Sequence, residues 1–307
     1  MYAVKEKELY STDVSSLDEL KNFRSKVDWL WVDCLTPDEK ELEIISELLG
    51  KEKTIVNEIK EGTYSLVYMY TSYERVNDCT LISIPYAEIE KELNMHPLFM
   101  IVKGKMLVTW GCEHWPKLMK AVIATVKDHV NNGLKTNTDF ILSRLFREVS
   151  AKNSRVIVSF KESIDKVEEE CLEKSGRKMV HSVFKLKKQI STLHRLLYLG
   201  QELMCDAKEG IIPSVHLNEG DAKLVIEDAI NDTYREMELL DSHDRALDSF
   251  LTLLSLGSVH RVETSINYLT IILVILTVIL VILELAARLP SSSNHGLILN
   301  AFSNMVA

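Results

Sequence analysis

The longest apolar stretch of the chain lies near its C-terminal end, at Tyr268–Ala287. Fourteen of these residues are Leu, Ile or Val, so a helix formed here is apolar on every side. Twenty residues at a rise of about 1.5 Å each cover about 30 Å, the hydrocarbon thickness of a bilayer. The pattern therefore predicts one transmembrane helix at 268–289. A buried core helix of a soluble protein would rarely stay apolar all round over this length.

In residues 1–133, short strand-like and helix-like patterns alternate. This predicts an α/β domain, a mixed sheet with flanking helices. Trp29–Cys34 is aromatic and β-branched, as in a strand, and Thr36, Pro37 and Glu39 then form a helix-starting pattern that Gly50 ends. Further strands are predicted at Tyr64–Ser72, Leu81–Ala87, Leu98–Val102 and Met106–Trp110, with a turn at Lys103–Lys105 before the last of them.

Beyond Gly133 the apolar residues recur three, four or seven positions apart, which predicts long amphipathic helices. Two antiparallel helices are expected at 134–217, the second ending at Gly200 or Gly210. A third helix opens near residue 218 and meets no proline before Pro290. It would comprise a cytoplasmic stalk at 218–267, of coiled-coil character, and the transmembrane helix, with Gly257 either as a bend or as a tolerated glycine.

Composition and charge exclude several classes of function. A net charge of −9 without a basic cluster gives nucleic-acid binding no support. The five cysteines are far apart and lack metal-ligand spacing, which suits a reducing compartment. The charged N-terminus lacks the apolar core of a signal peptide, so we expect a single-pass protein of the cell membrane with its N-terminal domain in the cytoplasm and a short extracytoplasmic tail at 290–307.

Enzymatic chemistry is the least supported class. The sequence has no activated nucleophile, no glycine-rich phosphate loop and no metal-ligand spacing, so no catalytic residue and no organic cofactor are predicted. The nine histidines are scattered, and His194 is expected to have no close partner.

Several short segments, in the same order along the chain, resemble those of one membrane-protein family. They are Trp29-Leu-Trp-Val-Asp33, Thr36-Pro37, Leu48-Leu-Gly50, Phe184-Lys-Leu-Lys187, Ser258-Val-His-Arg261 and Leu269-Thr-Ile-Ile272. Together with the order of domain, long helices and membrane helix, they make residues 25–285 resemble the CorA superfamily of magnesium and related divalent-cation transporters. The resemblance implies Mg²⁺ or another divalent cation as a transported or regulatory ion and a homo-oligomer, a pentamer in that family, in a lipid bilayer.

The chain departs from the family pattern at the end of the membrane helix. The family closes its first membrane helix with Gly-Met-Asn, whereas alignment on Leu269-Thr270 places Ala287-Arg288-Leu289 there. The family also has a second membrane helix, and Gly296–Ala307 supplies at most twelve of the roughly 20 residues needed to span. We therefore also consider a tail-anchored scaffold or regulator without pore activity, and a truncated gene product lacking the second helix.

Four polar residues along the predicted membrane helix are spaced seven apart: Glu263, Thr270, Thr277 and Glu284. They share one helix face, with a drift of about 20° per heptad. In an oligomer this face could line an aqueous path with a glutamate ring at each end, and carboxylate oxygens suit divalent cations. Alternatively, the threonine hydroxyls bond to carbonyls of their own helix, and Glu284 extends to the interface or pairs with Arg288.

Asp228 and Glu284 are the two candidate metal ligands. The resemblance implies that it contributes to a regulatory magnesium site between subunits, and its partner carboxylate is not identified by the sequence. Because Glu219, Asp221, Glu227 and Asp232 lie nearby, a solvated acidic helix face is the competing interpretation.

Overall fold

The computed structural model describes residues 2–5, 8–11, 17–34, 39–49, 71–89, 92–111, 115–173 and 177–288. The chain divides into two compact units, Met1–Phe250 and Leu251–Ala307. The first unit contains a sheet and the helices that cover it, and the second contains the C-terminal part of the longest helix.

Seven strands of the described residues form one mixed sheet in the order β2-β1-β3-β7-β6-β5-β4. Strands β3 and β7 are parallel and all other neighbours are antiparallel. The strands are β1 (Tyr2–Lys5), β2 (Glu8–Ser11), β3 (Trp29–Cys34), β4 (Ser72–Val76), β5 (Cys79–Ile89), β6 (Leu93–Lys103) and β7 (Met106–Trp110).

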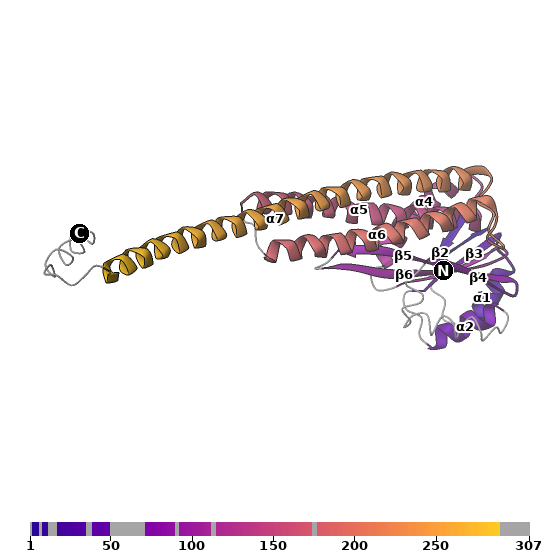
Figure 1. Cartoon of the computed structure of the whole chain (residues 1–307). Coiled ribbons are helices and arrows are strands. Elements are labelled where there is room, and N and C mark those ends of the chain that lie inside the picture. Colours follow the sequence, from indigo (N-terminus) through magenta and orange to yellow (C-terminus); the bar gives the residue numbers. More distant parts are fainter. Residues whose placement is uncertain are drawn as a thin grey trace. The chain divides into compact units, whose positions relative to one another are not determined.

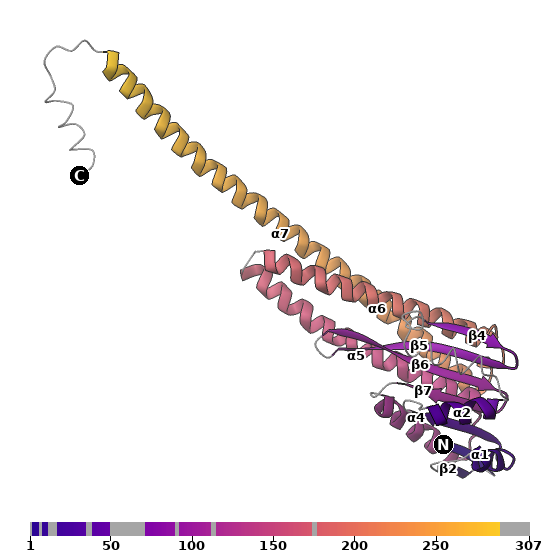
Figure 2. The ribbon, with the colours of Figure 1, turned by 90° about the horizontal axis from the view of Figure 1, so that it is seen from below.

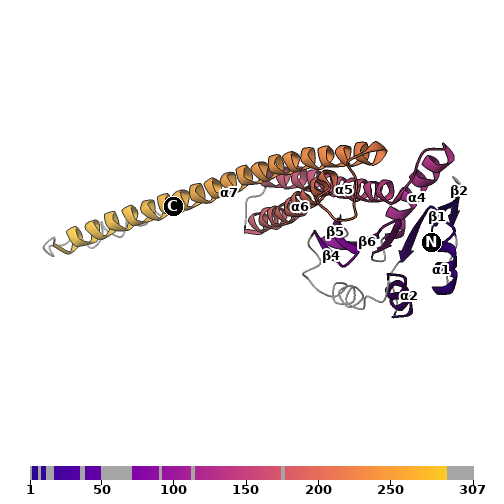
Figure 3. The ribbon, with the colours of Figure 1, turned by 90° about the vertical axis from the view of Figure 1, so that its right-hand side faces the viewer.

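Six helices of the described residues complete the architecture: α1 (Leu17–Arg24), α2 (Glu39–Leu49), α4 (Trp115–Asn131), α5 (Thr138–Glu173), α6 (Arg177–Glu209) and α7 (Gly220–Arg288). Figures 1 and 2 show α5, α6 and the first part of α7 running alongside one another over the sheet, with α1 and α2 on its opposite side. The first unit is therefore a three-layer α/β/α arrangement (Figure 3).

Each face of the sheet has its own hydrophobic core. One core joins the β-strand residues Trp31, Ile84 and Met100 to α4, α5, α6 and the start of α7. The other joins Leu30 and Phe99 to α1 and α2. Because both faces are covered, strands β5 and β7 read as nearly continuous apolar runs rather than as a strict alternation.

Glycines in the left-handed region end two of the helices. Gly133, at a φ of 73°, follows α4, and its N–H donates to Val130 O at 2.9 Å. Gly210, at a φ of 76°, follows α6, so of the two predicted ends the second is correct, and Gly200 lies inside the helix. A residue with a Cβ would be strained in either turn.

The predicted fold class is confirmed, and the strands at Trp29–Cys34 and Met106–Trp110 have the predicted bounds. Strands β5 and β6 are longer than predicted, while β1, β2, α1 and α4 have no counterpart in the sequence prediction. Most of the strand predicted at 64–72, the helix-starting Thr36 and Pro37, and the tail at 290–307 lie outside the described residues. The region boundaries at 133, 217 and 267 stay predictions.

Candidate functional site

The C-terminal part of α7 is long and apolar enough to cross a membrane. Val262–Leu285 is 24 residues long and includes an 18-residue stretch with a mean hydropathy of 2.9, none of which is buried inside the structure. At about 1.5 Å per residue this segment is about 36 Å long, which exceeds the hydrocarbon thickness of a bilayer. An exposed apolar helix of this length is stable only where something apolar, such as lipid, surrounds it.

The four residues of the polar stripe, Glu263, Thr270, Thr277 and Glu284, are exposed side chains of one continuous helix. Thr270 Oγ1 donates to Ile266 O and Thr277 Oγ1 donates to Leu273 O, each at 2.8 Å. These are the hydrogen bonds to carbonyls of the same helix that the alternative to a pore-lining role predicts. A hydroxyl that donates its proton keeps two acceptor lone pairs, so both threonines can still present oxygen to a cation. The geometry is thus compatible with both interpretations.

Asp228 forms an ion pair within its own chain. Its Oδ2 lies 2.9 Å from Arg147 Nη1 on α5. Both side chains are exposed, Asp228 to 67%. This pair is a competitor for any cation, because a divalent ion at Asp228 would have to displace or share the carboxylate with the guanidinium.

Polar contacts fasten the first part of α7 to both neighbouring helices. Toward α6, Lys208 pairs with Glu227 at 2.9 Å and Lys187 pairs with Asp244 and Asp248 at 2.8 Å each. His194 Nε2 also lies 3.3 Å from Asp241 Oδ1, so the expectation that His194 has no close partner is wrong. Sequence inspection missed this pair because the two residues lie on different helices.

Toward α5, α7 presents a partly polar seam. Ser150 and Thr233 are hydrogen-bonded through their hydroxyls at 3.0 Å, and Ser154 Oγ donates to Glu236 Oε1. Burial raises the pKa of Glu236 to about 7, against the opposing Ser154 hydrogen bond. Its Oε2 is buried and has no hydrogen-bond partner among the described residues. Seven residues along, burial lowers the pKa of His243, whose Nε2 is likewise buried without a partner there.

The sequence does contain a signal for this seam. Thr233, Glu236, Leu240, His243 and Leu247 are spaced three and four residues apart, as the inward stripe of a packed helix is. Leu240 and Leu247 are fully buried. Glu236 and His243 occupy two positions of this stripe, and burial there disfavours the charged form of each side chain.

Within a single chain, the described residues do not bring candidate metal ligands together. No group of three or more His, Cys, Asp or Glu side chains there is arranged to hold a metal ion. Asp228 and Glu284 therefore stay candidate ligands.

Replacing Asp228 with Asn distinguishes the two roles proposed for this residue. If Asp228 serves only the exposed pair with Arg147, the melting temperature should fall slightly, by an amount worth about 1 kcal/mol or less, with and without MgCl₂. If it binds a regulatory cation, the stabilisation by MgCl₂ should be lost. Thermal denaturation of the full chain in detergent measures both, with Asp232→Asn, which breaks an exposed pair with Arg235, as the control.

Comparison with known proteins supplies a family. The family model described as CorA-like Mg²⁺ transporter protein matches residues 26–280. No curated protein matches the chain. Among solved structures, the complete CorA magnesium transporter from Methanocaldococcus jannaschii is similar over 97% of this chain and 90% of its own, with a TM-score of 0.75 and 16% identity.

Two further structures have the same fold. The full-length CmaX protein is similar over 90% of this chain and 85% of its own, with a TM-score of 0.59 and 12% identity. The cytoplasmic domain of ZntB from Vibrio parahaemolyticus RIMD 2210633 is similar over 75% of this chain and 88% of its own, with a TM-score of 0.56 and 9% identity. At these identities the solved structures establish the fold of this chain alone.

Proposed function

We propose, because this chain belongs to the family of CorA-like Mg²⁺ transporter proteins, that several copies of it assemble in a membrane and pass Mg²⁺ or another divalent cation. The observation that carries the proposal is the family match, which runs from residue 26, just before β3, to residue 280 within the apolar segment. The pore-less scaffold considered from the sequence is not favoured, because the match includes most of the membrane segment as well as the cytoplasmic fold.

The path would be lined by the polar stripe of α7. Copies arranged around an axis would bring the four stripe positions into four rings, with Glu263 and Glu284 about 32 Å apart at a rise of about 1.5 Å per residue. Rings of carboxylates select cations, and hard divalent ions prefer oxygen ligands. The threonine rings between them would offer hydroxyl oxygens. Between Leu269 and Leu285, every residue off this stripe is Leu, Ile or Val, as a lipid-facing surface requires.

Apolar side chains on the first part of α7 support self-association. Leu224, Tyr234 and Leu239 are 62%, 53% and 46% exposed, although α5 and α6 already pack on this helix. Large exposed apolar residues along one packed helix are typical of a surface that meets a partner. A second copy is the partner we propose, with the pentamer as the family-based stoichiometry and the N-terminal unit on the cytoplasmic side.

The mass of the purified chain in mild detergent tests this assembly. A multimer is expected, since a monomer would leave both the apolar face and the polar stripe without partners. The double substitution Leu224→Glu and Leu239→Glu should shift the distribution toward smaller species, because it places charges in the contact. Glu238→Gln, an exposed change on the same helix, should leave the mass unchanged. A wild-type chain that is monomeric at all accessible concentrations would refute both the assembly and the pore.

A further inference from the structure

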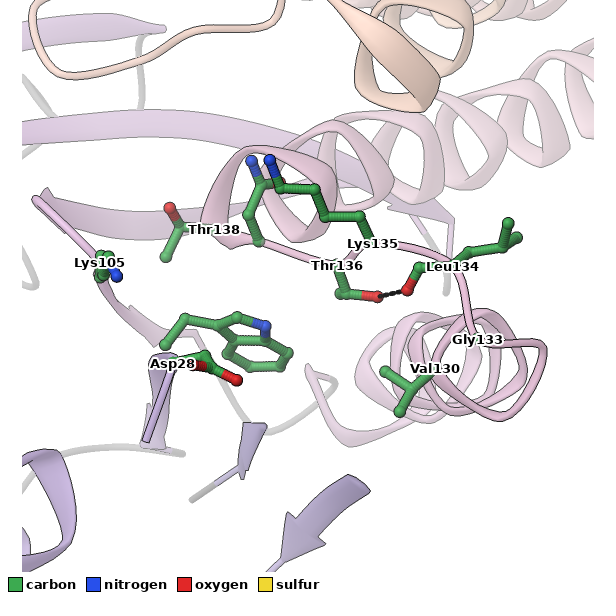
Figure 4. Close-up of a pocket in the computed structure, with 10 residues that line it drawn as sticks. Asp28, Lys105, Val130, Gly133, Leu134, Lys135, Thr136 and Thr138 are labelled. Carbon is green, nitrogen blue, oxygen red and sulfur yellow. Dashed lines mark hydrogen bonds between the residues drawn. The ribbon is translucent and has the colours of Figure 1, made fainter. Parts of the chain in front are cut away.

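The first unit contains a cavity that the transport function does not use. It lies between the start of β3, the β6–β7 turn, the end of α4 and the loop that leads into α5, and it measures about 520 Å³. Cavities of this size accommodate small molecules. Figure 4 shows four of its polar lining residues, Lys105 from the β6–β7 turn and Lys135, Thr136 and Thr138 from the loop and the first turn of α5.

The charges around this cavity favour an anion. Lys105 and Lys135 face it, against the single carboxylate of Asp28. The adjoining cavity, which shares Lys105 and Asp28, adds Arg24, Lys103 and Asp78. Lys103 is paired with Asp78 at 2.9 Å, and Arg24 Nη1 donates to Leu48 O at 3.3 Å. The region around the first cavity is therefore locally basic, although the chain as a whole has a net charge of −9.

Helix α5 begins at the cavity and contributes its positive end. Thr138 is the first residue of this 36-residue helix, and Asn137 caps it by accepting a hydrogen bond from Phe140 N–H at 2.9 Å. The first N–H groups of a helix lack acceptors within the helix and carry a partial positive charge. Helix N-termini of this kind are frequent binding sites for phosphate groups.

A buried hydrogen-bond donor in the same wall is the independent observation that points to a ligand. Trp29 lines the cavity and is only 3% exposed, and its indole Nε1 is buried without a hydrogen-bond partner among the described residues. A buried N–H without an acceptor destabilises the folded state, because the group has lost its hydrogen bond to water. An indole N–H can only donate, so an oxygen of an anion would satisfy it where a cation could not.

We propose that this cavity binds a phosphate-bearing small molecule, with Lys105 and Lys135 as charged contacts, the start of α5 as a backbone contact and Trp29 as a hydrogen-bond donor. The site lies next to a chain of hydrogen bonds that leads to α7. Thr136 Oγ1 is 3.1 Å from His129 Nδ1, and His129 Nε2 is 3.0 Å from Asp221 Oδ2 in the first turn of α7. A ligand that contacts Thr136 is thus two hydrogen bonds away from the start of the long helix.

Calorimetric titration of the full chain in detergent tests the proposal. The probes are inorganic phosphate, pyrophosphate and ATP, each without added divalent cation and at constant ionic strength set with KCl. We expect saturable binding of at least one probe at one site per chain. The double substitution Lys105→Gln and Lys135→Gln should weaken it at least about tenfold, as expected when charged hydrogen bonds are removed. Lys120→Gln, an exposed lysine of α4 outside the cavity, should bind as wild type does.

Trp29→Phe keeps an aromatic side chain, although a smaller one, and removes the N–H; it should weaken binding several-fold. If this variant does not fold, the lysine variants still decide, because both lysines are exposed. A second arm measures co-sedimentation with vesicles containing an anionic phospholipid. Binding to vesicles that depends on Lys105 and Lys135, with none of the soluble probes binding, would assign the site to a lipid headgroup and overturn the small-molecule proposal. Absence of binding to every probe, or equal binding by wild type and the double lysine variant, would overturn it as well.

Discussion

Replacing Glu284 with Gln is expected to abolish divalent-cation flux through the reconstituted protein, or to reduce it by at least about tenfold. The substitution keeps the shape of the side chain and removes the charge. In the proposed assembly it removes one of the two carboxylate rings along the stripe, and carboxylate oxygens are the ligands that a hard divalent ion prefers. Stabilisation of the oligomer by Mg²⁺, measured as the shift in melting temperature with ion concentration, should fall with it.

Arg288→Gln is the matched control for this experiment. Arg288 lies four residues after Glu284 and is the partner in the alternative in which Glu284 only forms a helical ion pair near the interface. Under the pore hypothesis, its replacement changes flux little. If Glu284→Gln conducts and responds to Mg²⁺ as wild type does, Glu284 is not part of a path, and the stripe of Glu263, Thr270 and Thr277 loses its main support.

The second large effect concerns the stability of the first unit as a function of pH. The pKa of Glu236 rises from 4.5 to about 7 on folding, chiefly through burial. A raised pKa in an acid means that the folded state binds its proton more tightly. The contribution to stability is therefore fully present below about pH 4.5 and is lost as the pH rises toward 7. At about 1.4 kcal/mol per pH unit, and with partial exposure of the side chain, the loss is about 1–3 kcal/mol.

Glu236→Gln should remove this loss, because the amide has the shape of the protonated acid and never ionises. The variant is expected to melt at a higher temperature than wild type at pH 8 and at nearly the same temperature at pH 5. Glu238→Gln is the control, an exposed residue of the same helix. A Glu236→Gln variant that is no more stable than wild type at pH 8, or that is stabilised equally at pH 5 and pH 8, would contradict the assignment.

The fold could be predicted from the sequence wherever the hydrophobic pattern fits only one kind of secondary structure. Val262–Leu285 is a long, predominantly apolar stretch, and α5, α6 and α7 follow long three-and-four spacings that no strand shares. Strands β3 and β7 were predictable because their apolar runs are short and bounded by turn residues. The N-terminal β1 and β2 are only four residues long each, and such short strands take their stability from pairing rather than from their own pattern.

The candidate site was predictable only in part, because its contacts join residues distant in sequence. The stripe of the membrane helix follows from spacing alone. The partner of Asp228 is Arg147 on another helix, 81 positions away. The donors around Trp29 come from three separate segments of the chain. Such convergence depends on the packing of the sheet against α4 and α5, which no local pattern encodes.

The central claim is that the assembled chain passes divalent cations, and flux into proteoliposomes tests it most directly. Purified oligomer is reconstituted into vesicles that contain a Mg²⁺-sensitive dye, and MgCl₂ is added outside. The account predicts that the internal Mg²⁺ signal rises at least about tenfold faster than in protein-free vesicles and that this rise depends on Glu284. A folded oligomer whose vesicles admit Mg²⁺ and other divalent cations no faster than protein-free vesicles would contradict it.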